Sequence, residues 1–193
     1  MSLHALLEEF PQTIRLKGGF EYETRPLEAS DEGAFHRFFQ AVPEQERMFI
    51  KHRVTDREVI RDWCANIDLG RNLPLLACAG DEIAAVATLH QQLGGWKRHI
   101  GRVSVLVHLD HRGRGLAATL VEATLQIARG VGLKRVEAEF IGEQTRAMHI
   151  FSLLGFDTLV RLDDYVEDMQ GTAHDYILMG LDLRTDEEFA GMG

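Results

Sequence analysis

The sequence has few cysteines, few prolines and no long hydrophobic run. Its 193 residues include only two cysteines, Cys64 and Cys78, which excludes a disulfide framework and a four-cysteine zinc site. No apolar run approaches the roughly 20 residues that a membrane-spanning helix needs. The first residues, MSLHALLEEF, carry acidic side chains and lack the basic region of a secretory signal. We therefore expect a cytoplasmic protein with no membrane partner, whose two thiols stay reduced and pack as small apolar side chains.

Basic residues are also in the minority. The chain has 21 lysines and arginines against 30 aspartates and glutamates, and its formal net charge is -9. This balance disfavours a nucleic-acid partner, which proteins usually bind through a basic surface. It is compatible with a cationic substrate such as an amine, and equally with a charge that serves solubility alone. Hydrophobic residues make up 45% of the chain, which is enough for the core of one globular domain.

The periodicity of apolar residues predicts one α/β domain with a mixed sheet. Residues 1–19 form an N-terminal amphipathic extension, 20–184 the domain, and 185–193 an acidic, glycine-rich tail that frays. Strands are predicted at 20–25, 75–79, 83–93, 99–107, 135–140, 156–166 and 175–183. Helices are predicted at 3–10, after an N-cap at Ser30, after a capping box at Thr55–Glu58, and at 116–131 and 145–154. The order within the domain is β-α-α-β-β-β-α-β-α-β-β.

The most informative stretch is a strand, a glycine-rich loop and a helix between residues 103 and 117. Unpaired N–H groups at the start of a helix form an anion site, and glycines let a phosphate approach the main chain. Arg112 and Arg114 add positive charge, so a diphosphate is the expected ligand. A P-loop is excluded because no Lys-Ser/Thr pair follows Gly115. Two alternatives stay open: a dinucleotide site on Gly113-x-Gly115-x-x-Ala118, and a helix start without a ligand.

The same stretch resembles a known family. Arg112-x-x-Gly115-x-Ala117 is similar to the Gln/Arg-x-x-Gly-x-Gly/Ala signature of the GNAT superfamily of acetyl-CoA-dependent N-acetyltransferases. Downstream, Ala147-x-x-x-Phe151-x-x-Leu154-Gly155-Phe156 is similar to the family's Asn-x-x-Ala-x-x-x-Tyr-x-x-x-Gly-Phe. The predicted strand order is also the family's order. The resemblance covers about residues 20–183, and the segment from Tyr165 to Met179 is similar to the branch that acetylates ribosomal and other protein N-terminal amines.

The resemblance implies a fold and a cofactor site. The fold is a mixed, mostly antiparallel sheet with flanking helices, in which the strands ending near Val107 and Phe140 splay apart. The diphosphate of acetyl-CoA is expected on the loop, its pantetheine arm along the strand before the loop, and a strand N–H is expected to polarise the thioester carbonyl. No metal is implied. The implied cofactor-binding residues are Ser104, Val105, Leu106, Val107, Arg112, Gly113, Arg114, Gly115, Leu116, Ala117, Gln144 and Phe151.

The resemblance also points to catalytic residues. The N-terminal acetyltransferase branch carries a catalytic glutamate five residues before the position of Gln144, which here is Glu139. Glu137 and Glu139 share one face of a short strand, so both are alternatively solvent-facing charges. Phe151 stands where many members have the tyrosine that protonates the leaving thiolate, and Gln144 where they have asparagine. Tyr165 is the replacement acid that we expect.

The expected function is acetyl transfer from acetyl-CoA to a primary amine of a small molecule, peptide or protein, by direct attack on the thioester. The alternative is a non-catalytic acyl-CoA-binding regulator of the same fold, which the departures at Phe151 and Gln144 keep open. The spacing of His108 and His111 does not suit two metal ligands on one helical face. The sequence does not identify the amine acceptor, and the resemblance is compatible with a homodimer.

Overall fold

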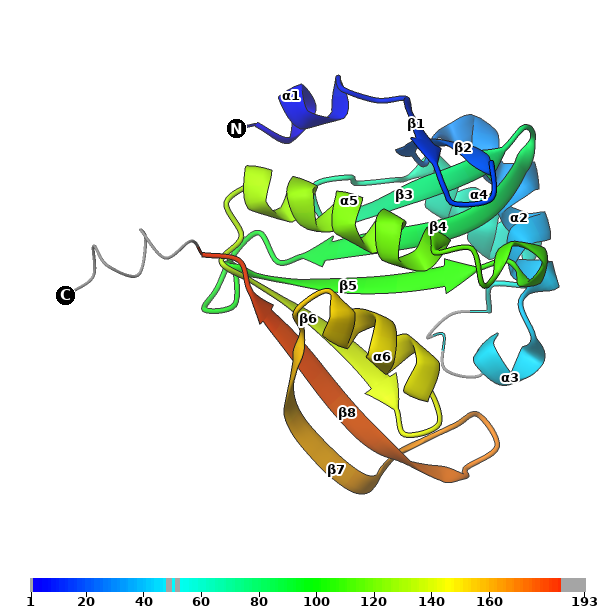
Figure 1. Cartoon of the computed structure of the whole chain (residues 1–193). Coiled ribbons are helices and arrows are strands. Elements are labelled where there is room, and N and C mark those ends of the chain that lie inside the picture. The colour runs from blue at the N-terminus through cyan, green and yellow to red at the C-terminus, as the bar shows by residue number, and fades with distance from the viewer. Residues whose placement is uncertain (1, 48–49, 51–52, 185–193) are drawn as a thin grey trace.

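An eight-stranded mixed sheet forms the centre of the protein (Figure 1). The computed structural model describes residues 2–47, 50 and 53–184, so the fraying expected for residues 185–193 lies outside the described residues. The strand order is β1-β2-β3-β4-β5-β6-β8-β7. Among the strand pairs of the described residues only β5–β6 is parallel, which confirms the mostly antiparallel sheet. The strands are β1 (Gln12–Arg15), β2 (Glu21–Pro26), β3 (Asn72–Ala79), β4 (Glu82–Gln91), β5 (Ile100–Val107), β6 (Arg135–Ile141), β7 (Asp157–Glu167) and β8 (Ala173–Asp182).

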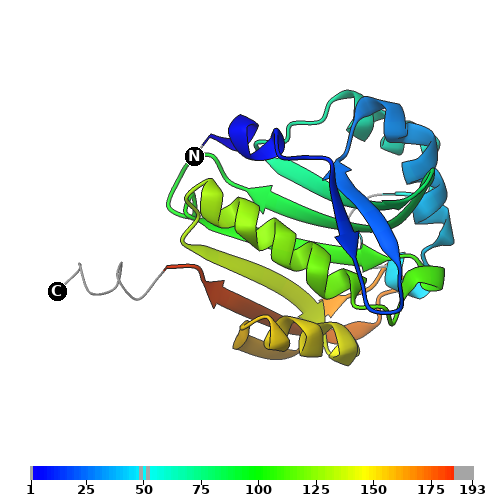
Figure 2. The ribbon, with the colours of Figure 1, turned by 45° about the horizontal axis from the view of Figure 1, so that its top comes forward.

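Helices cover the two faces of this sheet (Figure 2). The helices are α1 (Leu3–Leu7), α2 (Glu32–Ala41), α3 (Glu44–Arg47), α4 (Arg57–Ala65), α5 (Leu116–Gly130) and α6 (Thr145–Leu153). Helices α5 and α6 pack on one face in the larger apolar core, and α2 and α4 pack on the other in a second core. Both cysteines are buried in the second core, as expected from their apolar surroundings. Among the described residues, no helix is long and apolar enough to cross a membrane.

Several local features differ from the sequence prediction, among them the short helix α3, which was not predicted. Strand β1 pairs with β2 at the edge of the sheet and was not predicted, because four residues with one half-buried side chain show little alternation. Helix α4 begins one residue later than the capping box implies, since Asp56, not Thr55, accepts the N–H of Glu58 at 2.9 Å. Ser30 lies within a short 3₁₀ turn before α2 and is not its N-cap.

That 3₁₀ turn is fixed to β2 by a buried ion pair. Both carboxylate oxygens of Asp31, which is 7% exposed, accept hydrogen bonds of 2.7 Å from Arg25, and one also accepts the N–H of Glu28. Burial alone raises the pKa of Asp31, but the bonds from Arg25 and Glu28 outweigh it and hold the pKa below its ordinary value. The pair therefore stabilises the fold above the ordinary aspartate pKa, and this stabilisation is lost as the pH falls through the lowered pKa.

Candidate active site

The parallel strands β5 and β6 separate soon after they meet. Their pairing covers only Ile100–Arg102 against Arg135–Glu137, although β5 continues to Val107 and β6 to Ile141. Figure 1 shows the two strands diverging toward their C-terminal ends, as the resemblance implies. From Val103 onward β5 pairs with β4 on one side only. The divergence therefore leaves one edge of β5 available to a ligand that can pair with a strand, along the positions Ser104, Val105, Leu106 and Val107.

A glycine-rich loop joins the end of this free edge to helix α5. Gly113 and Gly115 have φ values of 75° and 85°, and Gly115 is the residue directly before the helix. The first hydrogen bond of the helix runs from the Thr119 N–H to the Gly115 carbonyl. Among the described residues, the N–H groups of 113–118, which include Leu116 and Ala117, have no hydrogen-bond acceptor, whereas the Arg112 N–H is bonded to Leu109. The donors for an anion therefore begin at Gly113.

The two arginines of the loop bind protein groups. Arg112 donates two hydrogen bonds of 2.8 Å to the carboxylate of Glu46 in α3, and one of 3.0 Å to the Val107 carbonyl. Arg114 donates to the Tyr22 hydroxyl at 3.0 Å and lies 4.0 Å above the Phe20 ring. These contacts brace the loop against α3 and the β1–β2 hairpin. We had expected both arginines to add positive charge for the ligand, but their guanidinium groups are largely occupied, which leaves the backbone N–H groups as the main anion donors.

Glu139 lies at the point where the gap opens. It is two residues beyond Glu137, the last residue of β6 that pairs with β5, and its side chain is 41% exposed. One carboxylate oxygen accepts a hydrogen bond of 3.0 Å from Arg102 of β5, and the other accepts the Tyr176 hydroxyl of β8 at 3.1 Å. Burial, followed by the charge of Glu139, raises the pKa of Tyr176 to about 12. Sequence reasoning gave Arg102 no role because it belongs to no motif, and it placed Tyr176 only within the segment that resembles the N-terminal acetyltransferase branch.

The β7–β8 hairpin stands beside these residues. Tyr165 of β7 is 66% exposed, and its ring centre lies 5.9 Å from that of Tyr176. His174 of β8 contacts Glu143 at 2.9 Å and Asp168 at 3.3 Å, which ties the hairpin to the β6–α6 loop. These two carboxylates raise the pKa of His174. The contacts of the charged imidazole are therefore complete below the ordinary histidine pKa and are lost as the pH rises through the raised value.

The two residues that depart from the family motif have structural roles. The Gln144 side-chain oxygen accepts the Ile141 N–H at 3.0 Å and closes the turn between β6 and α6. Phe151 is 1% exposed and packs edge-on between Phe140 and Phe156, with ring centres 5.0 and 4.9 Å apart. Such burial leaves the Phe151 ring almost no surface for a cofactor, and the ring has no proton to give.

In the described part of the chain, three residues with metal-ligand side chains come together, namely Glu82, His108 and His111. Arg114 approaches His111 Nδ1 at 3.1 Å, and the Asp110 N–H approaches His108 Nδ1 at 3.3 Å. Because both groups are donors, we assign each Nδ1 as an acceptor, so each Nε2 carries the hydrogen and faces Glu82. With these tautomers His111 Nε2 donates to Glu82 at 3.4 Å, while His108 Nε2 lies 3.7 Å from the same carboxylate.

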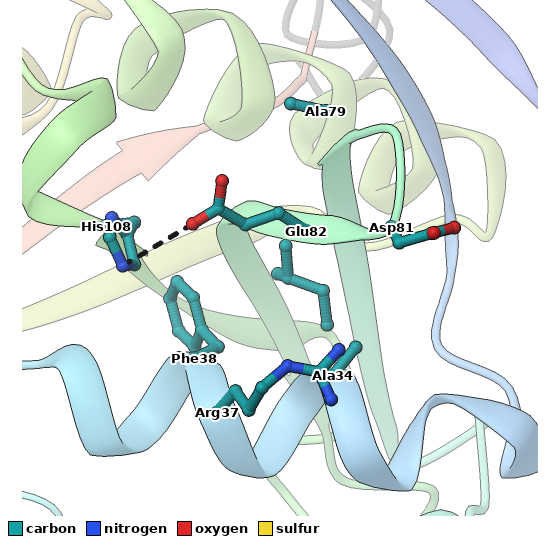
Figure 3. Close-up of a pocket in the computed structure, with 8 residues that line it drawn as sticks. Ala34, Arg37, Phe38, Ala79, Asp81, Glu82 and His108 are labelled. Carbon is teal, nitrogen blue, oxygen red and sulfur yellow. Dashed lines mark ion pairs between the residues drawn. The ribbon is translucent and has the colours of Figure 1, made fainter.

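A cavity also lies beside helix α2. A cavity of about 410 Å³ separates α2 from the β3–β4 turn, with Arg37 and Phe38 on the helix side and Glu82 and His108 opposite (Figure 3). An adjoining cavity of about 340 Å³ shares Arg37 with it. Residues of α2 line both cavities, and His108, which directly follows β5, lines the first. The candidate site itself is an open strand edge and a loop.

Comparison with known proteins decides the family. A sequence profile described as the acetyltransferase (GNAT) family matches residues 32–156, well over half of the chain. The chain belongs to this family. It is therefore an acyltransferase, and the glycine-rich loop at the start of α5 and the diverging strands β5 and β6 are the GNAT features of its fold. A search of curated proteins found no match.

Solved structures share the GNAT fold at low identity. The ribosomal-protein-S5-alanine acetyltransferase from Vibrio fischeri has a TM-score of 0.75 and 15% identity, covering 89% of this chain and 96% of its own. A putative acetyltransferase from Salmonella typhimurium, solved with its cofactor acetyl-CoA, has a TM-score of 0.71 and 18% identity, covering 85% and 95%. The ribosomal-protein-alanine N-acetyltransferase from Brucella melitensis has a TM-score of 0.69 and 18% identity, covering 82% and 98%.

Proposed function

We propose that this GNAT protein transfers the acetyl group of acetyl-CoA to a primary amine of a small molecule, peptide or protein. The observation that carries the proposal is the continuity of the free β5 edge with the unpaired N–H groups at the start of α5. A long ligand with an anionic end and an amide-bearing arm fits both features at once. The edge from Val103 to Val107 offers about 17 Å of strand at roughly 3.3 Å per residue.

The loop fits the diphosphate of such a ligand. A Cβ added at Gly113 or Gly115 meets no described atom within 4 Å, so both glycines face open space and are not packed against neighbours. Their positive φ values turn successive N–H groups toward that space. The helix dipole of α5 adds to the attraction for an anion. We propose that the N–H groups from Gly113 to Ala117 hold the diphosphate, while Arg112 and Arg114 hold the loop in shape.

The strand edge orients the reacting end of the donor. Bound acetyl-CoA would supply the activated acetyl thioester. Backbone groups of Ser104, Val105 and Leu106 pair with the arm in the manner of an added strand. A β5 N–H near the opening of the gap donates to the thioester carbonyl and stabilises the negative charge that develops on its oxygen.

We propose Glu139 as the general base. An amine attacks only in its neutral form, so a group must remove its proton, either directly or through a water molecule. Glu139 lies at the opening of the gap, and Arg102 and Tyr176 fix the direction of its carboxylate. Glu137 faces the same side but is less suited to the role, because its side chain is less exposed and it lies where β5 and β6 are still paired. Gln144 and Phe151 support the site from the β6–α6 turn and the core.

The acceptor class draws support from two observations. The Vibrio fischeri and Brucella melitensis neighbours are named as alanine acetyltransferases of ribosomal proteins, which makes a peptide N-terminus a candidate acceptor here. The net charge of -9 is compatible with a cationic amine. We also propose a cytoplasmic location, in keeping with the buried free thiols of Cys64 and Cys78. A homodimer is compatible with this function and is not required by it.

An amine screen tests the proposed function. The protein is incubated with acetyl-CoA and a panel of primary amines, including polyamines and peptides with N-terminal alanine, and the released thiol is measured. We expect at least one amine to give repeated turnovers, with one acetylated amine formed per thiol released. Tight binding of acetyl-CoA without turnover on a panel of this breadth would instead support a non-catalytic acyl-CoA-binding regulator.

A further inference from the structure

We propose that Tyr176 is the proton donor to the departing thiolate, and that Glu139 restores its proton. The inference rests on the proposed acetyl transfer and assigns a role to a residue for which the sequence motifs predict none. It answers a question that Phe151 raises, because the family position that commonly supplies this proton is here a buried ring without a hydroxyl.

Tyr176 and Glu139 reach the gap from the same face of the sheet. In the β6–β8 register Glu139 lies opposite Leu178 and Ile141 lies opposite Tyr176, so all four side chains share one face. The Tyr176 hydroxyl extends along this face to Glu139 Oε1 at 3.1 Å. Arg102 reaches Glu139 Oε2 from β5, on the other side of the gap. The row Arg102–Glu139–Tyr176 therefore spans three strands at the point where β5 and β6 part.

The surroundings of Tyr176 suit a donor more than those of Tyr165. Tyr176 is partly buried, and the groups that face it are Arg102 of β5, Glu137 and Glu139 of β6 and Tyr165 of β7. With a pKa of about 12 its phenol carries a proton throughout the working pH range. Tyr165 is 66% exposed, and among the described residues its hydroxyl has no hydrogen-bond partner. It therefore lacks the link to a base that would return its proton.

The proton transfers balance around one cycle. As the amine nitrogen forms the C–N bond and the C–S bond breaks, Glu139 accepts the proton that the nitrogen loses. Tyr176 gives its hydroxyl proton to the sulfur, and the protonated Glu139 returns a proton to the phenolic oxygen. A phenol with a pKa of about 12 is alone too weak an acid for a thiolate, whose conjugate thiol has a pKa near 8.5. The net transfer from a carboxylic acid to that thiolate is favourable, so the two residues must act together.

Binding of the product separates this role from a structural one without measuring turnover. Calorimetry gives the affinities of wild type and Tyr176→Phe for coenzyme A and for acetyl-CoA at pH 7 and at pH 9.5, where a much larger fraction of a free thiol is ionised. If Tyr176 donates to the thiolate, the variant loses about 10- to 100-fold in affinity for coenzyme A at pH 9.5. Its affinity for acetyl-CoA, which has no thiolate, stays within about twofold of wild type. A structural role for the hydroxyl moves both affinities equally.

The variant Tyr165→Phe tests the alternative that Tyr165 is the proton donor. Selective loss of coenzyme A affinity at pH 9.5 in Tyr165→Phe, with none in Tyr176→Phe, overturns the inference and assigns the proton to Tyr165. Equal coenzyme A affinities of wild type and Tyr176→Phe at pH 9.5 also overturn it. In both cases acetyl-CoA still binds, and the proposed function stands. Failure of wild type to bind either ligand is the separate result that removes the proposed function itself.

Discussion

Glu139→Gln is expected to lower kcat by about 10²- to 10⁴-fold, the usual cost of losing a general base. Glutamine keeps the size of the side chain and offers an oxygen to Arg102 and an amide to Tyr176, so the local fold is retained. The diphosphate loop lies on a different element, so the affinity for acetyl-CoA should stay within about threefold of wild type. Steady-state kinetics on a verified amine, with calorimetry for acetyl-CoA, measure both quantities.

Glu137→Gln is the matched control for this variant. Glu137 lies on the same strand and the same face, two residues nearer the end of β6 that pairs with β5. The kcat of Glu137→Gln should stay close to that of wild type. The loss of kcat in Glu139→Gln should shrink as the pH approaches the pKa of the amine, near 10.4 for a lysine-like amine, because more of the amine is then already neutral. If kcat of Glu139→Gln lies within about threefold of wild type, Glu139 is not the general base. A large loss of kcat in Glu137→Gln alone would assign the general base to Glu137 instead.

Gly115→Val should weaken binding of coenzyme A and acetyl-CoA by about 100-fold or more, which corresponds to roughly 2.7 kcal/mol. The valine side chain would occupy the open space in which the diphosphate is proposed to lie, and would strain a backbone whose φ is 85°. The strain costs about 1–3 kcal/mol of folding stability, which an ordinary domain tolerates. Calorimetry gives the affinity, and circular dichroism with thermal melting reports the fold.

Gly132→Val separates strain from steric exclusion of the ligand. Gly132 follows the other end of helix α5, has the same φ of 85°, and likewise has no described atom within 4 Å of an added Cβ. The two variants should therefore lose similar amounts of stability. Only Gly115→Val should lose coenzyme A affinity. Equal affinities of the two variants would place the ligand away from the loop.

Much of the fold follows from local patterns in the sequence. Helix α5 is predicted by apolar residues that recur at close to 3.6-residue spacing. Strand β6 is predicted by an alternation in which the apolar residues are Val136, Ala138 and Phe140 and the charged ones are Glu137 and Glu139. The αL residue Gly155 after α6 is predicted in the same way and has a φ of 91°. Strand β1 and the short helix α3 were missed, because four residues are too few to establish a period.

The site is predictable only where it is local. The loop from Arg112 to Ala117 is a continuous motif, so the sequence alone predicts its glycines and the start of the helix. The partners that fix it are far away in sequence: Glu46 lies 66 residues from Arg112, and Tyr176 lies 37 residues from Glu139. Such contacts depend on how strands and helices pack, and no spacing in one sequence encodes them.

Hydrogen–deuterium exchange with and without coenzyme A tests the central claim most directly, namely that the ligand lies on the glycine-rich loop and the free edge of β5. The N–H groups of residues 113–117, which have no acceptor among the described residues, should become protected, together with those of 103–107 that face away from β4. The walls of the 410 Å³ cavity around Arg37 and Phe38 should not change. Protection of that cavity, with the loop and β5 exchanging as before, would contradict the account.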